Sequence, residues 1–267
     1  MRSCNRLWRV RFVRQPKSQK LGEVFVGKVG ICSKRRGDMT SANDHTSDIE
    51  QLWHSSDASK WQRALDRYWN YIKPTHHPIE HEMDALRPDY VRRLDADQWY
   101  DWLLNKYCCW KYTAPNRYVT TTKYLKRQAA GLGRHHLLTI RDRVLGCENA
   151  SIRDALTAAT EFDGIGPAGA SGLLALLFPA KFGTVDQFAV GALRQVRCLP
   201  ERDKLWSMKP ESLTIRDGVV LIEIMRRKAV SLNELFNISG WTPRKVDKVL
   251  WASERRLTHH PSEACRV

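Results

Sequence analysis

Residues 162–186 read FDGIGPAGASGLLALLFPAKFGTVD, and this stretch decides the fold that the sequence predicts. Gly164 and Gly166 are separated by one residue and lie where the apolar pattern is interrupted. Glycine adopts the positive φ that a tight reversal of the chain needs, and it lets another backbone approach closely. Pro167 fits the first turn of a helix, because the N–H that proline lacks has no partner at that position. The stretch therefore predicts a hairpin that leads directly into a helix.

Helices are predicted on both sides of these glycines. Residues 151–160 have one apolar stripe and begin at Ser151, which can cap a helix, whereas residues 168–178 are short and almost wholly apolar. Loop amides at the start of the second helix would point outward, a geometry that suits a phosphate oxygen. The alternative is an ordinary helix–helix turn, since a lone Gly-x-Gly is a weak signal and no strand precedes it.

A single aspartate, Asp186, follows the second helix after the Gly/Pro-rich residues 179–183. In their order and spacing, residues 151–196 resemble the helix–hairpin–helix, Gly/Pro-rich loop, aspartate (HhH-GPD) superfamily of base-excision DNA glycosylases. Gly164-Ile165-Gly166 is similar to the hairpin of that family, and Asp186 falls where the family has its catalytic aspartate. The resemblance covers about forty residues. A helix is expected to begin directly after Asp186, and the positive end of its dipole would keep the Asp186 carboxylate ionised.

The resemblance implies an all-α fold of two helical lobes with a cleft between them. One lobe would comprise residues from about 100 to 183, with the hairpin at 162–167. The other lobe would pair residues 39–99 with residues 184–267. Asp186 would then face the cleft, and helical apolar stripes along most of the chain after residue 39 agree with this fold class.

Two departures from the family pattern narrow the implied activity. Members that also cut the strand have a lysine two residues after the second hairpin glycine, where this chain has Ala168. Other members hold an iron–sulfur cluster on four closely spaced cysteines after the aspartate, whereas here only Cys198 and Cys265 follow it. We therefore expect a monofunctional glycosylase without lyase activity or an iron–sulfur cluster. The one cofactor left open is a structural monovalent cation at the hairpin.

Further site residues follow from the same resemblance. The residues expected to hold a DNA phosphate are Gly164, Ile165, Gly166, Ala168 and Lys181. Residues 110–117 read as a loop in which aromatic and cationic side chains alternate, a pattern that suits base stacking and phosphate contact. The candidates for filling the gap left by an extruded base, or for lining its pocket, are Trp110, Lys111, Tyr112 and Asn116. For Trp110 the alternative is a place in the hydrophobic core.

The expected mechanism is base flipping followed by hydrolysis of the N-glycosidic bond. A base inside the duplex must be extruded into a pocket before its bond to the sugar can be reached. Asp186 would stabilise the oxocarbenium-like transition state and orient the attacking water. Two alternatives remain open at this stage: a non-catalytic helix–hairpin–helix DNA-binding protein, and an interaction scaffold that has lost the site. The excised base, and a role in repair or in defence against modified phage DNA, are also open.

The charge of the chain favours a polyanionic partner, which the resemblance identifies as double-stranded DNA bound by a monomer. There are 44 Lys and Arg residues against 29 Asp and Glu residues, a formal net charge of +15. Residues 1–38 hold eleven of the basic and two of the acidic residues, and parts of them are β-prone. Three interpretations of this basic N-terminal extension compete: a small β-hairpin, a DNA-binding arm, or a non-native extension upstream of Met39.

The remaining signals concern compartment and metal. Seven scattered cysteines fit a reducing cytoplasm, and neither a signal-peptide core nor a transmembrane run is visible, so we expect a cytoplasmic protein associated with the nucleoid through DNA. His77 and His81 have the spacing of metal ligands on a helix, but Pro78 argues against that helix. We therefore expect no metal site.

Overall fold

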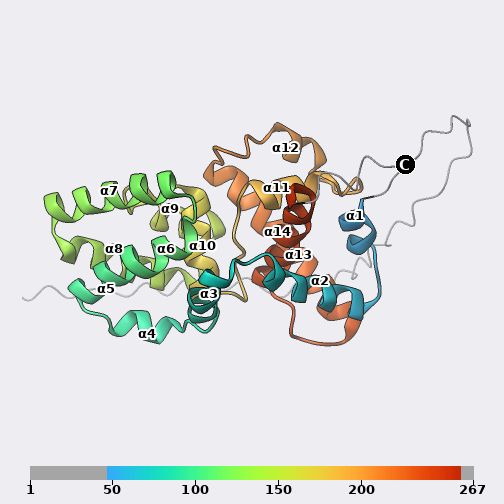
Figure 1. The fold of residues 1–267 in the computed structure, drawn as a ribbon, viewed down its shortest axis with the longest axis horizontal. Helices are drawn as coiled ribbons and strands as arrows, with labels where there is room; N and C mark the ends of the chain where they lie inside the picture. Colours follow the sequence, from blue (N-terminus) through green and yellow to red (C-terminus); the bar gives the residue numbers. More distant parts are fainter. Residues whose placement is uncertain (1–46, 260–267) are drawn as a thin grey trace, which may run out of the picture. The chain divides into compact units, whose positions relative to one another are not determined.

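Helices make up every regular element that the computed structural model describes, which is to say residues 47–259 (Figure 1). This confirms the predicted all-α class for that range. The extension predicted over residues 1–38 lies outside the described residues. The helices are α1 Asp48–Trp53, α2 Ala58–Asn70, α3 His77–Asp84, α4 Pro88–Arg93, α5 Ala96–Trp102, α6 Cys108–Lys111, α7 Pro115–Leu132, α8 Arg134–Gly146, α9 Ile152–Ala159, α10 Pro167–Leu177, α11 Gln187–Arg194, α12 Arg202–Ser207, α13 Ile215–Phe236 and α14 Pro243–His259.

The glycine hairpin forms between α9 and α10. Ser151 caps α9, since its hydroxyl oxygen accepts a hydrogen bond from the amide of Asp154 at 3.1 Å. Gly164 has φ +83°, a conformation that L side chains rarely adopt, and Gly166 occupies the N-cap position of α10. Between the two glycines, Ile165 turns inward and is buried. The hairpin therefore exposes backbone at its glycines, while the buried side chains of Phe162 and Ile165 anchor it in the core.

One group of helices surrounds this hairpin. Helix α8 packs against α4, α5, α7 and α9, and α9 packs against α10 (Figure 1). The fully buried Trp99 of α5 links two of these helices, because its indole N–H donates to the carbonyl of Leu137 in α8 at 3.2 Å. Helices α4 and α5 thus belong with the hairpin, and the group starts earlier in the chain than the predicted boundary near residue 100.

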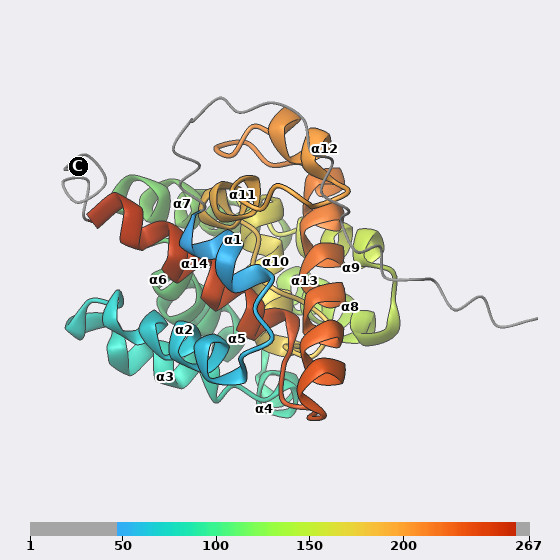
Figure 2. The same cartoon turned by 90° about the vertical axis from the view of Figure 1, so that its right-hand side faces the viewer.

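Helix α14 is central to a second group. It contacts α1, α2, α11 and α13 (Figure 2). Trp61 of α2 is fully buried and meets the ring of Trp241 edge-on, with the ring centroids 5.6 Å apart. The two groups share one core, because α13 also packs on α9 and α10. Helices α10, α11 and α14 are therefore parts of one packed core, which fixes their positions relative to one another.

Two local departures from the predicted elements matter for the site. Helix α5 is followed by a π-helical turn at Leu103–Tyr107 before α6, and no local sequence pattern predicts that turn. The predicted loop at 110–117 is shorter than expected, because α6 includes Trp110 and Lys111 and α7 begins at Pro115. Proline at the first helical position explains why α7 begins there.

The described residues add two findings, one on helix length and hydropathy and one on the cysteines. None of their helices combines the length and the apolar character that crossing a membrane requires. Four of the seven cysteines fall in the described range, and all four are free thiols: Cys108, Cys109, Cys147 and Cys198.

Candidate functional site

Asp186 is the N-cap residue of α11. One carboxylate oxygen, Oδ1, accepts hydrogen bonds from the amides of Phe188 and Ala189, each at 3.0 Å. Among the described residues, the other oxygen, Oδ2, accepts none. The half-buried side chain lines a pocket of about 200 Å³. The cap fixes the carboxylate and leaves one oxygen for a ligand.

The pocket combines aromatic, aliphatic and charged side chains from distant parts of the chain. Helices α2, α3, α6 and α14 contribute to its wall, together with the segment that precedes α11. Such a mixture of an apolar lining and a few polar groups is typical of a small-molecule or base pocket. The residues around Asp186 in this wall are Tyr68, Tyr71, Ile72, Lys73, His76, Ile79, Glu80, Trp110, Lys111, Thr113, Thr184, Arg244, Asp247, Trp251 and Arg255.

Lys111 brings an amine into the same pocket as Asp186. It is the last residue of α6, and its aliphatic stem crosses α10 at Gly172, where an added Cβ would lie 3.1 Å from Lys111 Cδ. Burial lowers the pKa of Lys111, and the carboxylate of Asp186 opposes that shift by favouring the charged amine. The structure therefore places Lys111 in the pocket wall rather than on a free loop.

A buried polar network lies in the pocket wall. The guanidinium of Arg244 donates to Asp247 Oδ1 at 2.9 Å and to Glu80 Oε1 at 3.3 Å, and all three side chains are less than one-tenth exposed. Glu80 also accepts hydrogen bonds from Tyr68 and Trp110, each at 2.6 Å. Burial alone lowers the pKa of Arg244, but the neighbouring carboxylates outweigh it and hold that pKa above its usual value.

This network also holds the segment that leads into Asp186. Asp247 Oδ2 accepts from the amide of Thr184 at 2.5 Å, and the hydroxyl oxygen of Ser171, on α10, accepts from the amide of Val185 at 2.9 Å. Burial raises the pKa of Asp247 to about 6, although Arg244 and the Thr184 amide oppose the shift. The backbone before Asp186 is thus fixed between the hairpin helix α10 and helix α14.

The start of α10 presents unpaired amides. Among the described residues, the amides of Gly164, Gly166, Ala168 and Gly169 donate to no backbone or side-chain acceptor, and Gly166 has no side-chain cap. A Cβ at Gly166 would meet nothing within 4 Å, so the space beside this exposed glycine is open, whereas Gly169 is buried under Tyr112. Unpaired amides and the positive end of a helix dipole together favour an anion at this position.

Helix α7 holds the hairpin from the other side. A Cβ at Gly164 would lie 2.9 Å from Tyr124 Cβ and 3.1 Å from the carbonyl oxygen of Thr121. The side-chain amide of Gln128 makes two hydrogen bonds to the hairpin. Its Nε2 donates to the Glu161 carbonyl at 2.7 Å, and its Oε1 accepts from the Asp163 amide at 2.9 Å. The exposed basic residues of α7 are Arg117, Lys123, Lys126 and Arg127.

Two predicted phosphate ligands need correction. The amide of Ile165 donates to the carbonyl of Phe162 at 3.0 Å, so it is not available to a phosphate. The ammonium of Lys181 donates to Asn149, which precedes α9, whereas the hairpin follows α9. A helix of that length spans about 12 Å at ~1.5 Å per residue, so Lys181 and the hairpin lie at opposite ends of α9.

The other candidates from residues 110–117 lie in three different places in the structure. Trp110 is buried in the network and lines the pocket with Lys111 and Asp186. Tyr112 lies over the hairpin helix, since a Cβ at Gly169 would be 2.2 Å from its hydroxyl oxygen, and burial raises its pKa. Asn116 is exposed in the first turn of α7, where its side-chain oxygen accepts from the amide of Arg117.

Several residues of the site escaped the sequence interpretation. Glu80 belongs to the histidine-rich tract at 76–81, but the histidines drew attention because of their spacing. In the structure His81 stacks on Trp69 with ring centroids 4.3 Å apart, and a ring nitrogen of His77 lies 3.0 Å from the Ile72 carbonyl oxygen. The carboxylate in that tract, rather than its imidazoles, joins the pocket network.

Comparison with known proteins gives this geometry no external counterpart. No family model matches the chain, and neither a curated protein nor a solved structure matches it.

Proposed function

We propose that this protein is a DNA glycosylase that hydrolyses the N-glycosidic bond of a damaged or modified base and leaves an abasic site. One observation carries the proposal. Helix α10 has unpaired amides at its start, and its Ser171 holds the backbone of Val185 directly before Asp186, which lines a pocket and whose Oδ2 accepts no hydrogen bond from the described residues. An anion-binding helix start, and an aspartate whose preceding backbone is held by that same helix, suit a substrate that has a phosphate close to its reacting sugar.

In the proposed mechanism the amides of Gly166, Ala168 and Gly169 bind a phosphate of double-stranded DNA. The extruded base enters the pocket between α2, α6 and α14, at a cost of a few kcal/mol in lost stacking. Asp186 Oδ2 faces the sugar as the bond to the base lengthens, stabilises the developing positive charge and orients the attacking water. The α11 amides hold Oδ1, so the carboxylate needs no rearrangement during the reaction.

Lys111 supports this chemistry from the wall of the same pocket. When charged, its ammonium offers a hydrogen-bond donor to the departing base, which leaves as an anion or accepts a proton. Burial lowers its pKa, so the amine can give up a proton more readily than a surface lysine. Ala168 leaves the hairpin helix without a lysine, and we propose that the enzyme is monofunctional and acts as a monomer on DNA in the cytoplasm.

The experiment that tests this proposal is a screen for released bases. Purified protein is incubated with genomic, alkylated, oxidised, deaminated and hypermodified phage DNAs, and the supernatant is analysed by mass spectrometry. Asp186→Asn serves as the matched control, because asparagine is an equally good N-cap. We expect one class of base to be released by the wild type and not by the variant.

Two results would reject the proposal. Tight DNA binding without any base release from these DNAs would favour a non-catalytic DNA-binding protein. Absence of both binding and release would favour an interaction scaffold.

A further inference from the structure

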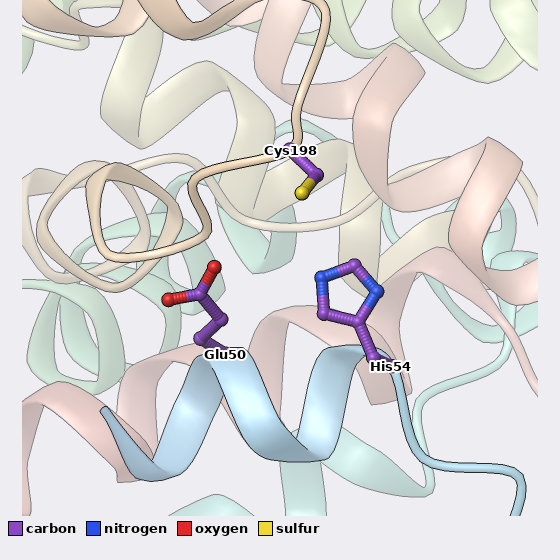
Figure 3. Close-up of side chains that lie close together, drawn as sticks. All are labelled: Glu50, His54 and Cys198. Carbon is purple, nitrogen blue, oxygen red and sulfur yellow. The ribbon is translucent and has the colours of Figure 1, made fainter. Parts of the chain in front are cut away.

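A second cluster of chemically reactive side chains lies away from the pocket. The side chains of Glu50, His54 and Cys198 are directed toward one another (Figure 3). One carboxylate oxygen, one imidazole nitrogen and the thiol sulfur all lie within 4.8 Å of one another. Glu50 lies in α1, and His54 is the residue directly after the end of α1. Cys198 lies in the segment between α11 and α12. The cluster therefore joins two segments that are far apart in the chain.

The sequence spacing explains how two of these ligands share a face. Residues four apart on a helix are neighbours, and Glu50 and His54 have this spacing along α1. Tetrahedral zinc has donors at roughly 2.0–2.3 Å, which places the donors about 3.3–3.8 Å from one another. The cluster must contract by roughly 1 Å to reach that geometry. His54 and Cys198 are exposed and can close on an ion by rotation of their side chains.

The donor set is specific in its chemistry. Thiolate, imidazole and carboxylate are the three ligand types that zinc accepts in proteins, and a thiolate disfavours magnesium and calcium. Glu50 is buried, so its carboxylate is held in one place while the other two ligands approach from the solvent side. This combination differs from a cluster of exposed acidic groups, which attracts cations without selecting among them.

Glu50 already connects the two segments without a metal. Its Oε1 accepts from the backbone amide of Arg197 at 3.2 Å, and its Oε2 lies 3.4 Å from the guanidinium of the same residue. The arginine side of that ion pair is about half exposed and the carboxylate side is nearly buried, so a zinc ion that replaces the guanidinium would keep the charge of Glu50 compensated. The hydrogen bond from the Arg197 amide to Glu50 keeps Cys198, the residue after Arg197, beside α1.

We propose that Glu50, His54 and Cys198 bind one zinc ion, with water in the fourth position, and that the ion clips α1 to the segment after α11. Binding requires Cys198 as a thiolate, so one thiol proton is released to solvent for each ion bound. The proposal is independent of the glycosylase activity. Its consequence is a gain in stability, since an ion that binds only the folded chain shifts the unfolding equilibrium.

The test uses the full-length protein after removal of metals with a chelator. Zinc(II) is added, excess is removed by desalting, and the bound metal is measured by mass spectrometry. We expect close to one zinc per chain. The melting temperature should rise by roughly 5–10 °C when free zinc exceeds its Kd a hundredfold. Cobalt(II) in place of zinc should give the absorption band of thiolate-to-cobalt charge transfer.

Point variants identify the ligands. Cys198→Ser and His54→Gln should each weaken zinc binding by at least about tenfold, and Cys198→Ser should abolish the charge-transfer band, because each removes one ligand. The matched control is Cys147→Ser, which removes a partly exposed thiol elsewhere in the described structure. Both ligand positions are exposed, so circular dichroism of the variants should match the wild type. Zinc bound equally well by Cys198→Ser, or no zinc retained by the wild type, would overturn the proposal.

Discussion

Replacing Arg244 with leucine tests whether the pocket wall depends on its buried charges. The guanidinium neutralises two carboxylates, Glu80 at 3.3 Å and Asp247 at 2.9 Å, and the three side chains are 5–8% exposed. Both carboxylates keep other hydrogen bonds in the variant, from Tyr68 and Trp110 to Glu80 and from the Thr184 amide to Asp247. What the variant loses is the compensating charge, and removal of one partner from a buried ion pair costs about 3–5 kcal/mol.

Chemical denaturation measures this loss directly. Arg244→Leu should lower the free energy of unfolding by about 3–5 kcal/mol. Arg92→Leu is the matched control, because Arg92 forms an ion pair with Asp89 in which both side chains are more than half exposed; it should change stability by less than about 0.5 kcal/mol.

The pH dependence of the Arg244→Leu variant gives a second readout. Burial raises the pKa of Asp247 to about 6 even with Arg244 present. Without Arg244 the folded chain binds a proton there still more readily than the unfolded chain does. The variant is therefore closest to the wild type at about pH 5 and loses stability as the pH rises to about 8. If Arg244→Leu lowers the free energy of unfolding by less than about 1 kcal/mol at both pH values, the buried carboxylates of the pocket wall do not depend on the charge of Arg244, and the reasoning is refuted.

Three further predictions address the hairpin and the amine. Gly166→Val should lower the melting temperature by only a few degrees, because a Cβ there meets open space but valine is a poorer N-cap than glycine, and should weaken DNA binding about tenfold at all sequences, as measured by fluorescence anisotropy. Gly164→Ala should instead destabilise the fold by about 1–3 kcal/mol in denaturation, because φ is +83° and Tyr124 Cβ is 2.9 Å away. Strand breaks at the released site should require hot alkali, because Ala168 replaces the hairpin lysine; breaks without alkali that Lys111→Gln abolishes would contradict this expectation.

The local parts of the fold could be predicted because their signals are local. The cap Ser151, the glycine hairpin and the position of Asp186 at a helix start each depend on a few adjacent residues. Neighbouring residues alone determine caps, turns and helix starts, so one sequence suffices for them.

The pocket could not be predicted, because its charges meet across the whole chain. Glu80 and Arg244 are 164 positions apart, and no local pattern relates them. Lys111 was a pocket candidate from the sequence, but the rotation of α6 that turns it into the wall could not be predicted, for another reason. The π-helical turn at Leu103–Tyr107 has more residues per turn than an α-helix, so it rotates every side chain that follows, and nothing in the sequence signalled it.

The central claim is that Asp186 acts on the sugar and does not only cap a helix. The most direct measurement is the single-turnover rate of base release by Asp186→Asn, at saturating enzyme, beside its DNA affinity and melting temperature. Asparagine retains the bonds to the α11 amides, so we expect unchanged binding and stability, and a rate reduced by at least about 10²–10³-fold. A rate equal to that of the wild type would contradict the account.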